Sequence, residues 1–315
     1  MTSPRLDRLI GLTLVLVTGC VIAREWGAAD WVNIPCYLLL VVAIAALFVE
    51  VRPGRKAFVF VALGLTAALA WRVEDWTSVV MDGLYSASFI AAFFTALATL
   101  RSAAEPSEDI RASGRFLAEQ PPGRRYLALT LGASAFALLL NYGAIALLGS
   151  LATAAAQDEP DAEIRMHRRR RMLLAIQRGF VTSLPWSPLS FAIAISTALI
   201  PGGSWEGAVL PALGTAVLMT LIGWGLDTIF KPRLTNPAPV RRKPEGSWAL
   251  LLPLALLLGI LVASVLTLGA LTGIRVIGLV LLIVPVMALI WTLLQARSGG
   301  APLGQRLKTY AFRDL

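Results

Sequence analysis

A run of hydroxyl and proline residues interrupts the sixth apolar stretch of the chain, residues 172–200. Proline has no backbone N–H, so Pro185 and Pro188 each free one carbonyl of the preceding helical turn, and each disfavours helical geometry in the residue before it. We therefore expect a helix that is broken near the middle of a membrane. Ser187 before Pro188 has the pattern of an N-cap followed by a first helical residue, so a second half-helix is predicted to begin there.

A break of this kind can bind ions. The free N–H groups and positive dipole end of the second half-helix favour an anion, whereas the freed carbonyls of the first half favour a cation. The preceding apolar stretch, residues 126–156, has one strong polar break at Asn141-Tyr142-Gly143, and Asn141 is predicted to cap a half-helix that starts at Gly143. The alternative is a kink that serves only helix packing.

The predicted substrate- and ion-binding residues come from these two breaks. They are Asn141, Tyr142, Gly143, Ser183, Pro185, Ser187, Pro188 and Ser190. A sodium ion would be held at Asn141, Ser183 and Ser187, with nearby carbonyls as further ligands.

The length of 126–156 is unusual, because its 31 residues are too many for one untilted span and too few for two. The segment after it ends in five arginines, Arg165 and 168–171. Positively charged loops stay on the cytoplasmic side. If 126–156 enters and leaves the membrane on that side as a helical hairpin, these arginines and all later basic loops lie inside. One long tilted helix with Asn141 facing a neighbour is the alternative.

Composition supports a membrane protein, since 57% of the residues are hydrophobic, 15% are charged, and mean hydropathy is +0.72. The expected fold is an all-α polytopic membrane protein with about eight transmembrane helices, one re-entrant hairpin and one helix broken at mid-membrane. The spans are expected at about 9–23, 31–50, 57–71, 78–100, 172–200, 207–230, 248–271 and 274–296. The short segments of alternating apolar and polar residues that are typical of transmembrane β-barrel strands are missing.

Charge placement predicts the orientation. Basic loops alternate with mixed loops flanked by tryptophan, which puts the N-terminus in the cytoplasm and the protein in the cell (inner) membrane as a multi-pass chain. The net charge of +9 lies in these short loops, so a nucleic-acid partner is not expected. The expected partners are the lipid bilayer and a small solute. Cys20 and Cys36 are interpreted as small hydrophobic residues.

A few other ionisable residues lie within or beside the expected spans. Asp82 is expected at the membrane interface, and Asp227 is expected to act as a cap or to pair with Arg233. Arg178 would either reach the lipid headgroups or complement an anionic solute. The single histidine, His167, has no second metal ligand or nucleophile to serve. We therefore predict no enzyme activity, no metal site and no cofactor beyond a coupling Na⁺ or H⁺.

The order of four scaffold helices, a hairpin with the tip Asn141-Tyr142-Gly143 and a helix broken at 187–190 resembles the first repeat of the ion transporter superfamily. That group includes divalent anion/sodium symporters, arsenite pumps and sodium/proton antiporters of the arsenite-pump type. The resemblance covers about residues 78–230. In its symporters a Ser-Asn-Thr motif at each hairpin tip binds substrate and sodium; here Asn141 matches the asparagine, while Leu140 and Tyr142 replace its neighbours.

The resemblance also implies a second, inverted repeat, and no second hairpin or Ser-Pro break follows residue 230. Either the chain is truncated before that repeat, or a homodimer or second half-transporter subunit supplies it. The predicted division is 1–125 as scaffold helices, 126–230 as the transport-site unit and 231–315 as C-terminal spans that begin a truncated repeat. The predicted function is secondary active transport of a small, anionic solute coupled to sodium or protons by alternating access. The alternative is a non-transporting membrane anchor or subunit of a larger complex.

Overall fold

The computed structural model describes residues 4–232, 234–235 and 246–298, and within these ranges every regular element is a helix. Seven helices are long and apolar enough to cross a membrane, so the chain is a multi-pass membrane protein. They are α1 (Pro4–Glu25), α2 (Asn33–Glu50), α3 (Pro53–Arg72), α4 (Trp76–Ala104), α10 (Trp205–Ile229), α11 (Leu252–Thr272) and α12 (Val276–Ser298). Each corresponds to a span expected from the sequence. The eighth expected stretch, 172–200, is divided between two helices, as its predicted break requires.

The chain forms two compact units, one made of the residues up to Thr99 with the segment from Ile290 onward, and the other of Leu100–Leu289. In the first unit α1 and α2 pack together, and the short 3-10 helix η1 (Asp30–Val32) leads into α2. Arg24 at the end of α1 stacks on the ring of Tyr85 in α4, at 3.5 Å from the ring centroid. By contrast, α3 buries none of its residues within the chain.

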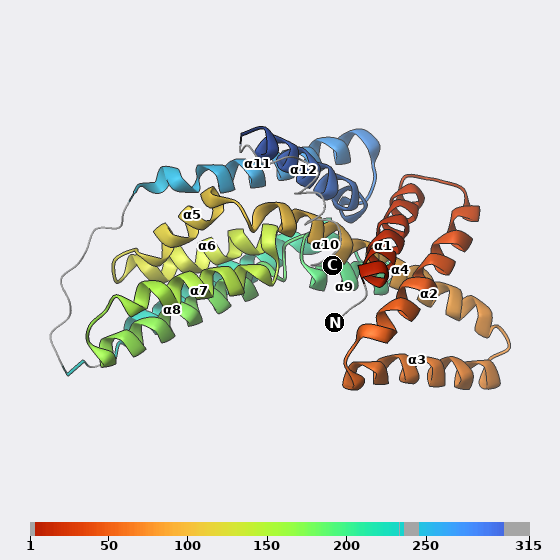
Figure 1. The fold of residues 1–315 in the computed structure, drawn as a ribbon, viewed down its shortest axis with the longest axis horizontal. Helices are drawn as coiled ribbons and strands as arrows, with labels where there is room; N and C mark the ends of the chain where they lie inside the picture. The colour runs from red at the N-terminus through yellow and green to blue at the C-terminus, as the bar shows by residue number, and fades with distance from the viewer. Residues whose placement is uncertain (1–3, 233, 236–245, 299–315) are drawn as a thin grey trace. The chain divides into compact units, whose positions relative to one another are not determined.

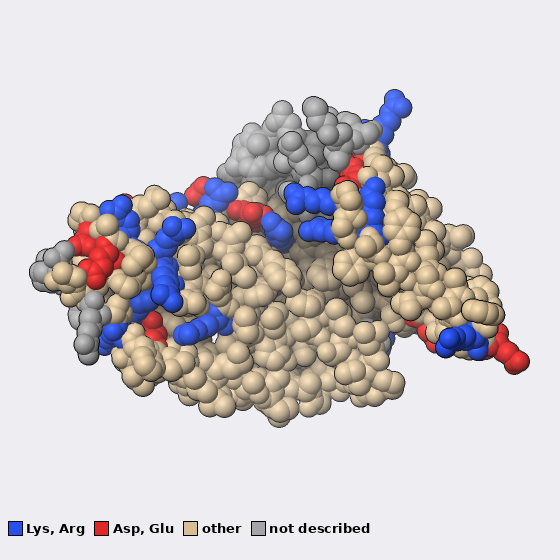
Figure 2. Space-filling model, turned by 90° about the horizontal axis from the view of Figure 1, so that it is seen from below, with Lys and Arg blue, Asp and Glu red and all other residues tan. Residues whose placement is uncertain are grey.

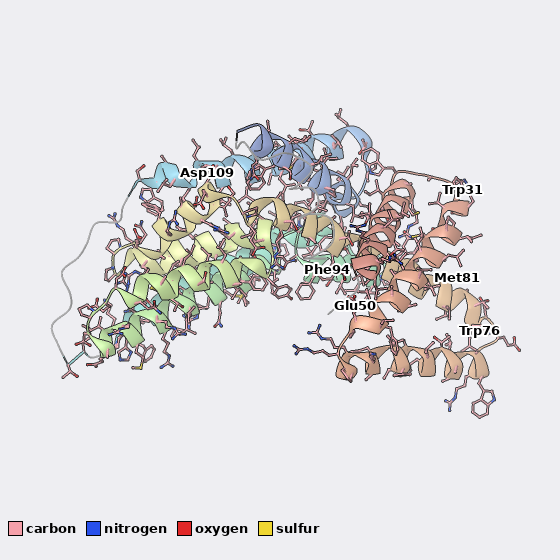
Figure 3. All side chains as sticks on the ribbon, in the orientation of Figure 1. Trp31, Glu50, Trp76, Met81, Phe94 and Asp109 are labelled. Carbon is pink, nitrogen blue, oxygen red and sulfur yellow. The ribbon has the colours of Figure 1, made fainter. Side chains whose placement is uncertain are left out.

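Aromatic residues mark the ends of the helices in this first unit. Trp31 stands beside the start of α2 and Trp76 at the start of α4, and both lie at one end of the unit, whereas Glu50 lies at the other end of α2 (Figure 3). Trp31 is largely exposed. Tryptophan is enriched where membrane helices meet the headgroup region, which agrees with the tryptophan-flanked loops predicted on one side.

The second unit is built on three helices that lie side by side, α6 (Arg124–Leu140), α7 (Gly143–Gln157) and α8 (Ala162–Ser183) (Figure 1). Helix α5 (Glu108–Ala118) covers α6 and α7, and α10 packs on α6 and α8. The 3-10 helix η2 (Trp248–Leu251) and α11 pack on α5. Large apolar side chains fill the centre, among them Leu129, Phe136, Leu148, Met172 and Ile176.

Hydrogen bonds define how α6 and α8 align. Thr130 Oγ1 donates to the carbonyl of Ala175 at 3.3 Å, and Ser134 Oγ donates to that of Gly179 at 2.6 Å. Both pairs are 45 residues apart, so the two helices run parallel. A Cβ at Gly179 would overlap the carbonyl oxygen of Thr130, so the two backbones approach more closely than a side chain allows.

Helix α10 runs antiparallel to α8. At one end the indole Nε1 of Trp205 donates to the carbonyl of Trp186, and at the other Arg171 binds Asp227. Helices α6 and α8 are thereby placed alongside a helix long enough to cross a membrane. The stretch 126–156 is two helices separated by a reversal of the chain, so the alternative of one long tilted helix is wrong.

Candidate functional site

The predicted break in the sixth apolar stretch is present. Helix α8 ends at Ser183, and seven residues separate it from helix α9 (Phe191–Leu199). The prediction that Ser187 caps the second half is wrong by three residues. Ser190 is the N-cap, and its Oγ accepts from the backbone N–H of Ile193 at 3.3 Å. Ser187 Oγ instead accepts from the N–H of Leu189 at 3.1 Å, which closes a turn before the helix starts.

The carbonyls freed by the two prolines already have partners. Ser190 Oγ donates to the carbonyl of Leu184 at 2.6 Å, and the backbone N–H of Leu184 donates to the carbonyl of Val181 at 3.2 Å. Ser183 Oγ donates to the carbonyl of Phe180 at 2.7 Å. In this conformation each of these carbonyls therefore has one hydrogen-bond partner from a local hydroxyl or N–H group.

The hairpin tip has a strained backbone. Asn141 has φ 49° and ψ −127°, and Tyr142 has φ −58° and ψ −24°. This pair of conformations is close to a type II′ turn, whose first central position normally holds glycine. Asn141 is the one non-glycine residue with positive φ among those that the structure describes. Strain of this kind persists where the surroundings enforce it, and it concentrates at functional sites.

The side chain of Asn141 does not cap α7, contrary to the prediction. Tyr142 holds the N-cap position without a side-chain hydrogen bond, and the backbone carbonyl of Asn141 accepts from the N–H of Ala144 at 3.1 Å. The positive φ turns the chain so that the backbone, not the carboxamide, meets the helix start. The carboxamide makes no hydrogen bond to any described residue, so both its donor and its acceptor remain available.

Tyr142 brings the two predicted segments together. Its ring centroid lies 5.1 Å from that of Phe180 in α8 and 5.9 Å from that of Phe191, the first residue of α9. The hairpin tip thus packs across the interruption between the two half-helices. Tyr142 is 52% exposed, whereas Ser183, Ser187 and Ser190 are buried. The accessible groups of this site come from the hairpin, and the serines of the break lie beneath the surface.

Arg101, expected in the basic loop after the span 78–100, lies against the hairpin tip. A Cβ at Gly143 would lie 3.0 Å from Arg101 Nε, so the absence of a side chain at Gly143 lets the guanidinium rest against the hairpin tip. Glu105 pairs with Arg101 at 3.3 Å. The guanidinium of Arg101 thus lies beside the first turn of α7. The free backbone N–H groups of that turn also favour an anion. No local pattern around Arg101 indicates this contact.

The other ionisable residues also differ from expectation. Arg178 Nη1 donates to the hydroxyl of Tyr126 and to the carbonyl of Gly223, both at 3.2 Å, so it joins helices of the bundle instead of reaching toward lipid headgroups. Asp227 pairs with Arg171, and Arg233, its expected partner, lies outside the described residues. The bidentate hydrogen bond with Asp227 raises the pKa of Arg171.

In the described part of the chain, no group of three or more His, Cys, Asp or Glu side chains is placed to hold a metal ion. Cys20 and Cys36 are free thiols. Comparison of the chain with protein-family models, with curated proteins and with solved structures finds no match.

Proposed function

We propose that this protein is a secondary active transporter of a small anionic solute, with its binding site where the α6–α7 tip meets the α8–α9 interruption. The observation that supports this most is the packing of Tyr142 on both Phe180 and Phe191. Two interrupted helical elements meeting at one place is the recurring construction of secondary-transporter sites. Irregular backbone at membrane depth is tolerated only where protein or a water-filled cavity surrounds it.

Helices α6 and α7 would form a re-entrant hairpin in this proposal. Their 17 and 15 residues give lengths of about 26 and 22 Å, short of the roughly 30 Å of the hydrocarbon core. Both are in contact with α8, and α10 alongside is long enough to span. The open end of the hairpin, where α6 and α8 begin, carries many arginines and would face the cytoplasm, as would the N-terminus.

The solute's anionic group would be bound by the carboxamide of Asn141 and the guanidinium of Arg101, beside the first turn of α7. The hydroxyls of Ser183, Ser187 and Ser190 are engaged in local hydrogen bonds in this conformation. They would become ligands of the solute or of a coupling Na⁺ or H⁺ in a second conformation, in which the interruption opens. A site that is complete in only one of two conformations is what alternating access requires.

The resemblance to the ion transporter superfamily supports the same proposal and adds a requirement for a second hairpin. A homodimer or a second half-transporter subunit would supply it. The alternative function, a membrane anchor or subunit of a larger complex, is favoured by one observation: α3 leaves all its residues unburied, including Phe58, Leu65 and Trp71. Such a face accommodates either lipid or a partner helix.

Two measurements test the proposal. First, in a background without Cys20 and Cys36, single cysteines replace Asp158 at the hairpin base and Glu206 at the start of α10, in sealed vesicles of known orientation. A re-entrant hairpin predicts that D158C is labelled from the cytoplasmic side and E206C from the opposite side. Labelling of D158C from outside would make 126–156 cross the membrane and would rule out the hairpin.

Second, purified protein in proteoliposomes is assayed for uptake of radiolabelled succinate and sulfate under a sodium or a proton gradient. N141A, S187A and R101Q are expected to abolish uptake while membrane insertion remains normal. Uptake preserved in N141A and S187A would refute the site assignment. Absence of uptake and of any anion-dependent thermal stabilisation in the wild type would favour the anchor function.

A further inference from the structure

A second charged site lies at the opposite end of the helices from the hairpin tip. Figure 2 shows Lys and Arg side chains gathered at the end where α8 begins, with a few acidic side chains among them. Three of the arginines come from two helices: Arg125 from the start of α6, and Arg168 and Arg171 from the first half of α8. None of them belongs to the tip site.

The alignment of α6 and α8 brings these arginines together. The offset of 45 residues that pairs Thr130 with Ala175 and Ser134 with Gly179 places Tyr126 level with Arg171 when it is continued by one turn. Arg125 therefore lies at the height of the arginine run in α8. Burial lowers the pKa of Arg125 to about 10, and the positive charges of Arg168 and Arg171 add to that effect.

The carboxylates nearby do not neutralise all three cations. Arg171 is held in a bidentate ion pair, because its Nε and Nη2 bind the two carboxylate oxygens of Asp227 at 2.9 and 2.6 Å. Arg168 approaches Glu159 only to 4.0 Å, and its Nε is buried without a hydrogen-bond partner. Arg125 donates through Nε to the carbonyl of Gln120 at 2.6 Å.

The two terminal nitrogens of Arg125 make no hydrogen bond to any residue that the structure describes. Two guanidinium groups thus keep unused donors in one cationic cluster. The Nε of Arg168 is buried, and a buried charged donor is costly unless a counter-ion from outside the chain completes it.

We propose that Arg125 and Arg168 bind a phosphate group at this end of the unit, with Arg171 contributing positive charge from its ion pair with Asp227. A carboxylate needs only one guanidinium edge, as the pairing of Arg171 with Asp227 shows. A phosphate offers three or more acceptor oxygens and a second negative charge, so it can engage guanidinium groups from two helices together. The phosphate can be a free or esterified phosphate ion or the headgroup of an anionic lipid, since the chemistry is shared.

Binding would link the start of α6 to the second and third turns of α8 and so hold these two helices in register. This inference does not depend on transport, because the cluster shares no residue with the tip. It predicts that phosphate stabilises the protein when no transported solute is present.

The test uses full-length protein in nanodiscs of a zwitterionic lipid, with thermal unfolding and equilibrium binding measured against inorganic phosphate or against chloride at matched ionic strength. A second arm replaces part of the lipid with phosphatidic acid. The variant is R125Q/R168Q. The matched control is R169Q/R170Q, which removes the same charge from the two exposed arginines next to the cluster.

We expect inorganic phosphate, phosphatidic acid or both to raise the unfolding temperature of the wild type and of R169Q/R170Q, with affinity reduced at least about tenfold in R125Q/R168Q. A response to inorganic phosphate identifies a free phosphate as a ligand, and a response to phosphatidic acid alone identifies the lipid. An equal loss in both double variants, or no response in the wild type, overturns the proposal. If R125Q/R168Q does not fold, R125K, which keeps the charge but loses the planar fork, must still bind phosphate more weakly than R169Q/R170Q.

Discussion

The Oγ of Ser190 donates a 2.6 Å hydrogen bond to the carbonyl oxygen of Leu184, the acceptor that Pro188 leaves without its helical N–H. The same oxygen accepts from the backbone of Ile193 and so caps α9. One hydroxyl thus closes the end of one half-helix and starts the next. The interruption is consequently held as a defined turn, with its polar groups satisfied inside a buried environment.

Ser190→Ala should destabilise the protein more than the loss of an ordinary cap. It removes the cap and also leaves the Leu184 carbonyl unbonded, for an expected loss of about 2–3 kcal/mol, against about 1 kcal/mol for a cap alone. Ser204→Ala is the control, because Ser204 caps the exposed start of α10 through Gly207 and makes no second bond of this kind. Denaturant unfolding in detergent measures both. Equal losses would mean that the bond to Leu184 contributes nothing.

Asn141 allows backbone strain to be separated from side-chain chemistry. At φ 49° glycine suffers no Cβ penalty, so Asn141→Gly should be more stable than Asn141→Ala by about 1–2 kcal/mol. Both variants lose the carboxamide, so both should lose anion uptake to the same extent. Unfolding midpoints and proteoliposome uptake are measured on the same preparations. If the glycine variant is no more stable than the alanine variant, the turn changes its backbone conformation and residue 141 no longer keeps a positive φ.

Gly179 tests the close approach of α6 and α8. A methyl group there meets the backbone of Thr130 and the Cβ of Ala133, which cannot move aside as a flexible side chain can. Gly179→Ala should therefore cost several kcal/mol or prevent folding, typical of overpacking against backbone. Gly149→Ala is the control, since its nearest neighbour is Leu173 Cδ2 at an ordinary 3.5 Å. It should be neutral or slightly stabilising, because alanine is the better helix former.

Local sequence rules predicted the elements better than the contacts between them. Span positions follow from hydropathy, and the interruption follows from two prolines three residues apart, so both were identified. The capping residue was misplaced because Ser187 and Ser190 each satisfy the N-cap preference. Only the three-dimensional position of the Leu184 carbonyl, within reach of Ser190, distinguishes them. The contact of Arg101 with Gly143 depends on how α4 and α5 fold back, which no short-range pattern encodes.

The ion pair between Arg171 and Asp227 should show strong coupling. Both side chains are partly buried and the contact is bidentate, so a double-mutant cycle with R171Q and D227N should give a coupling energy of about 1–2 kcal/mol. Arg101 and Glu105 provide the comparison, since that pair is more exposed and its single contact is longer, at 3.3 Å. Exposed helix pairs contribute about 0.3–0.5 kcal/mol. Similar coupling energies in the two double-mutant cycles would contradict the prediction that the partly buried, bidentate pair is the stronger one.

Tyr142 should control access to the buried serines, because its ring spans the two half-helices through Phe180 and Phe191. Tyr142→Ala removes both aromatic contacts, each worth about 0.5–1.5 kcal/mol beyond simple burial, whereas Tyr142→Phe retains them. In a background without native cysteines, a cysteine in place of Ser183, which is 3% exposed, reports opening through its rate of reaction with a thiol reagent. The alanine variant should react at least about tenfold faster than the parent, as expected when about 1.4 kcal/mol of closing free energy is lost. The phenylalanine variant should match the parent. If all three react at the same rate, the tip does not cover the interruption, and the movement proposed for transport must occur elsewhere in the chain.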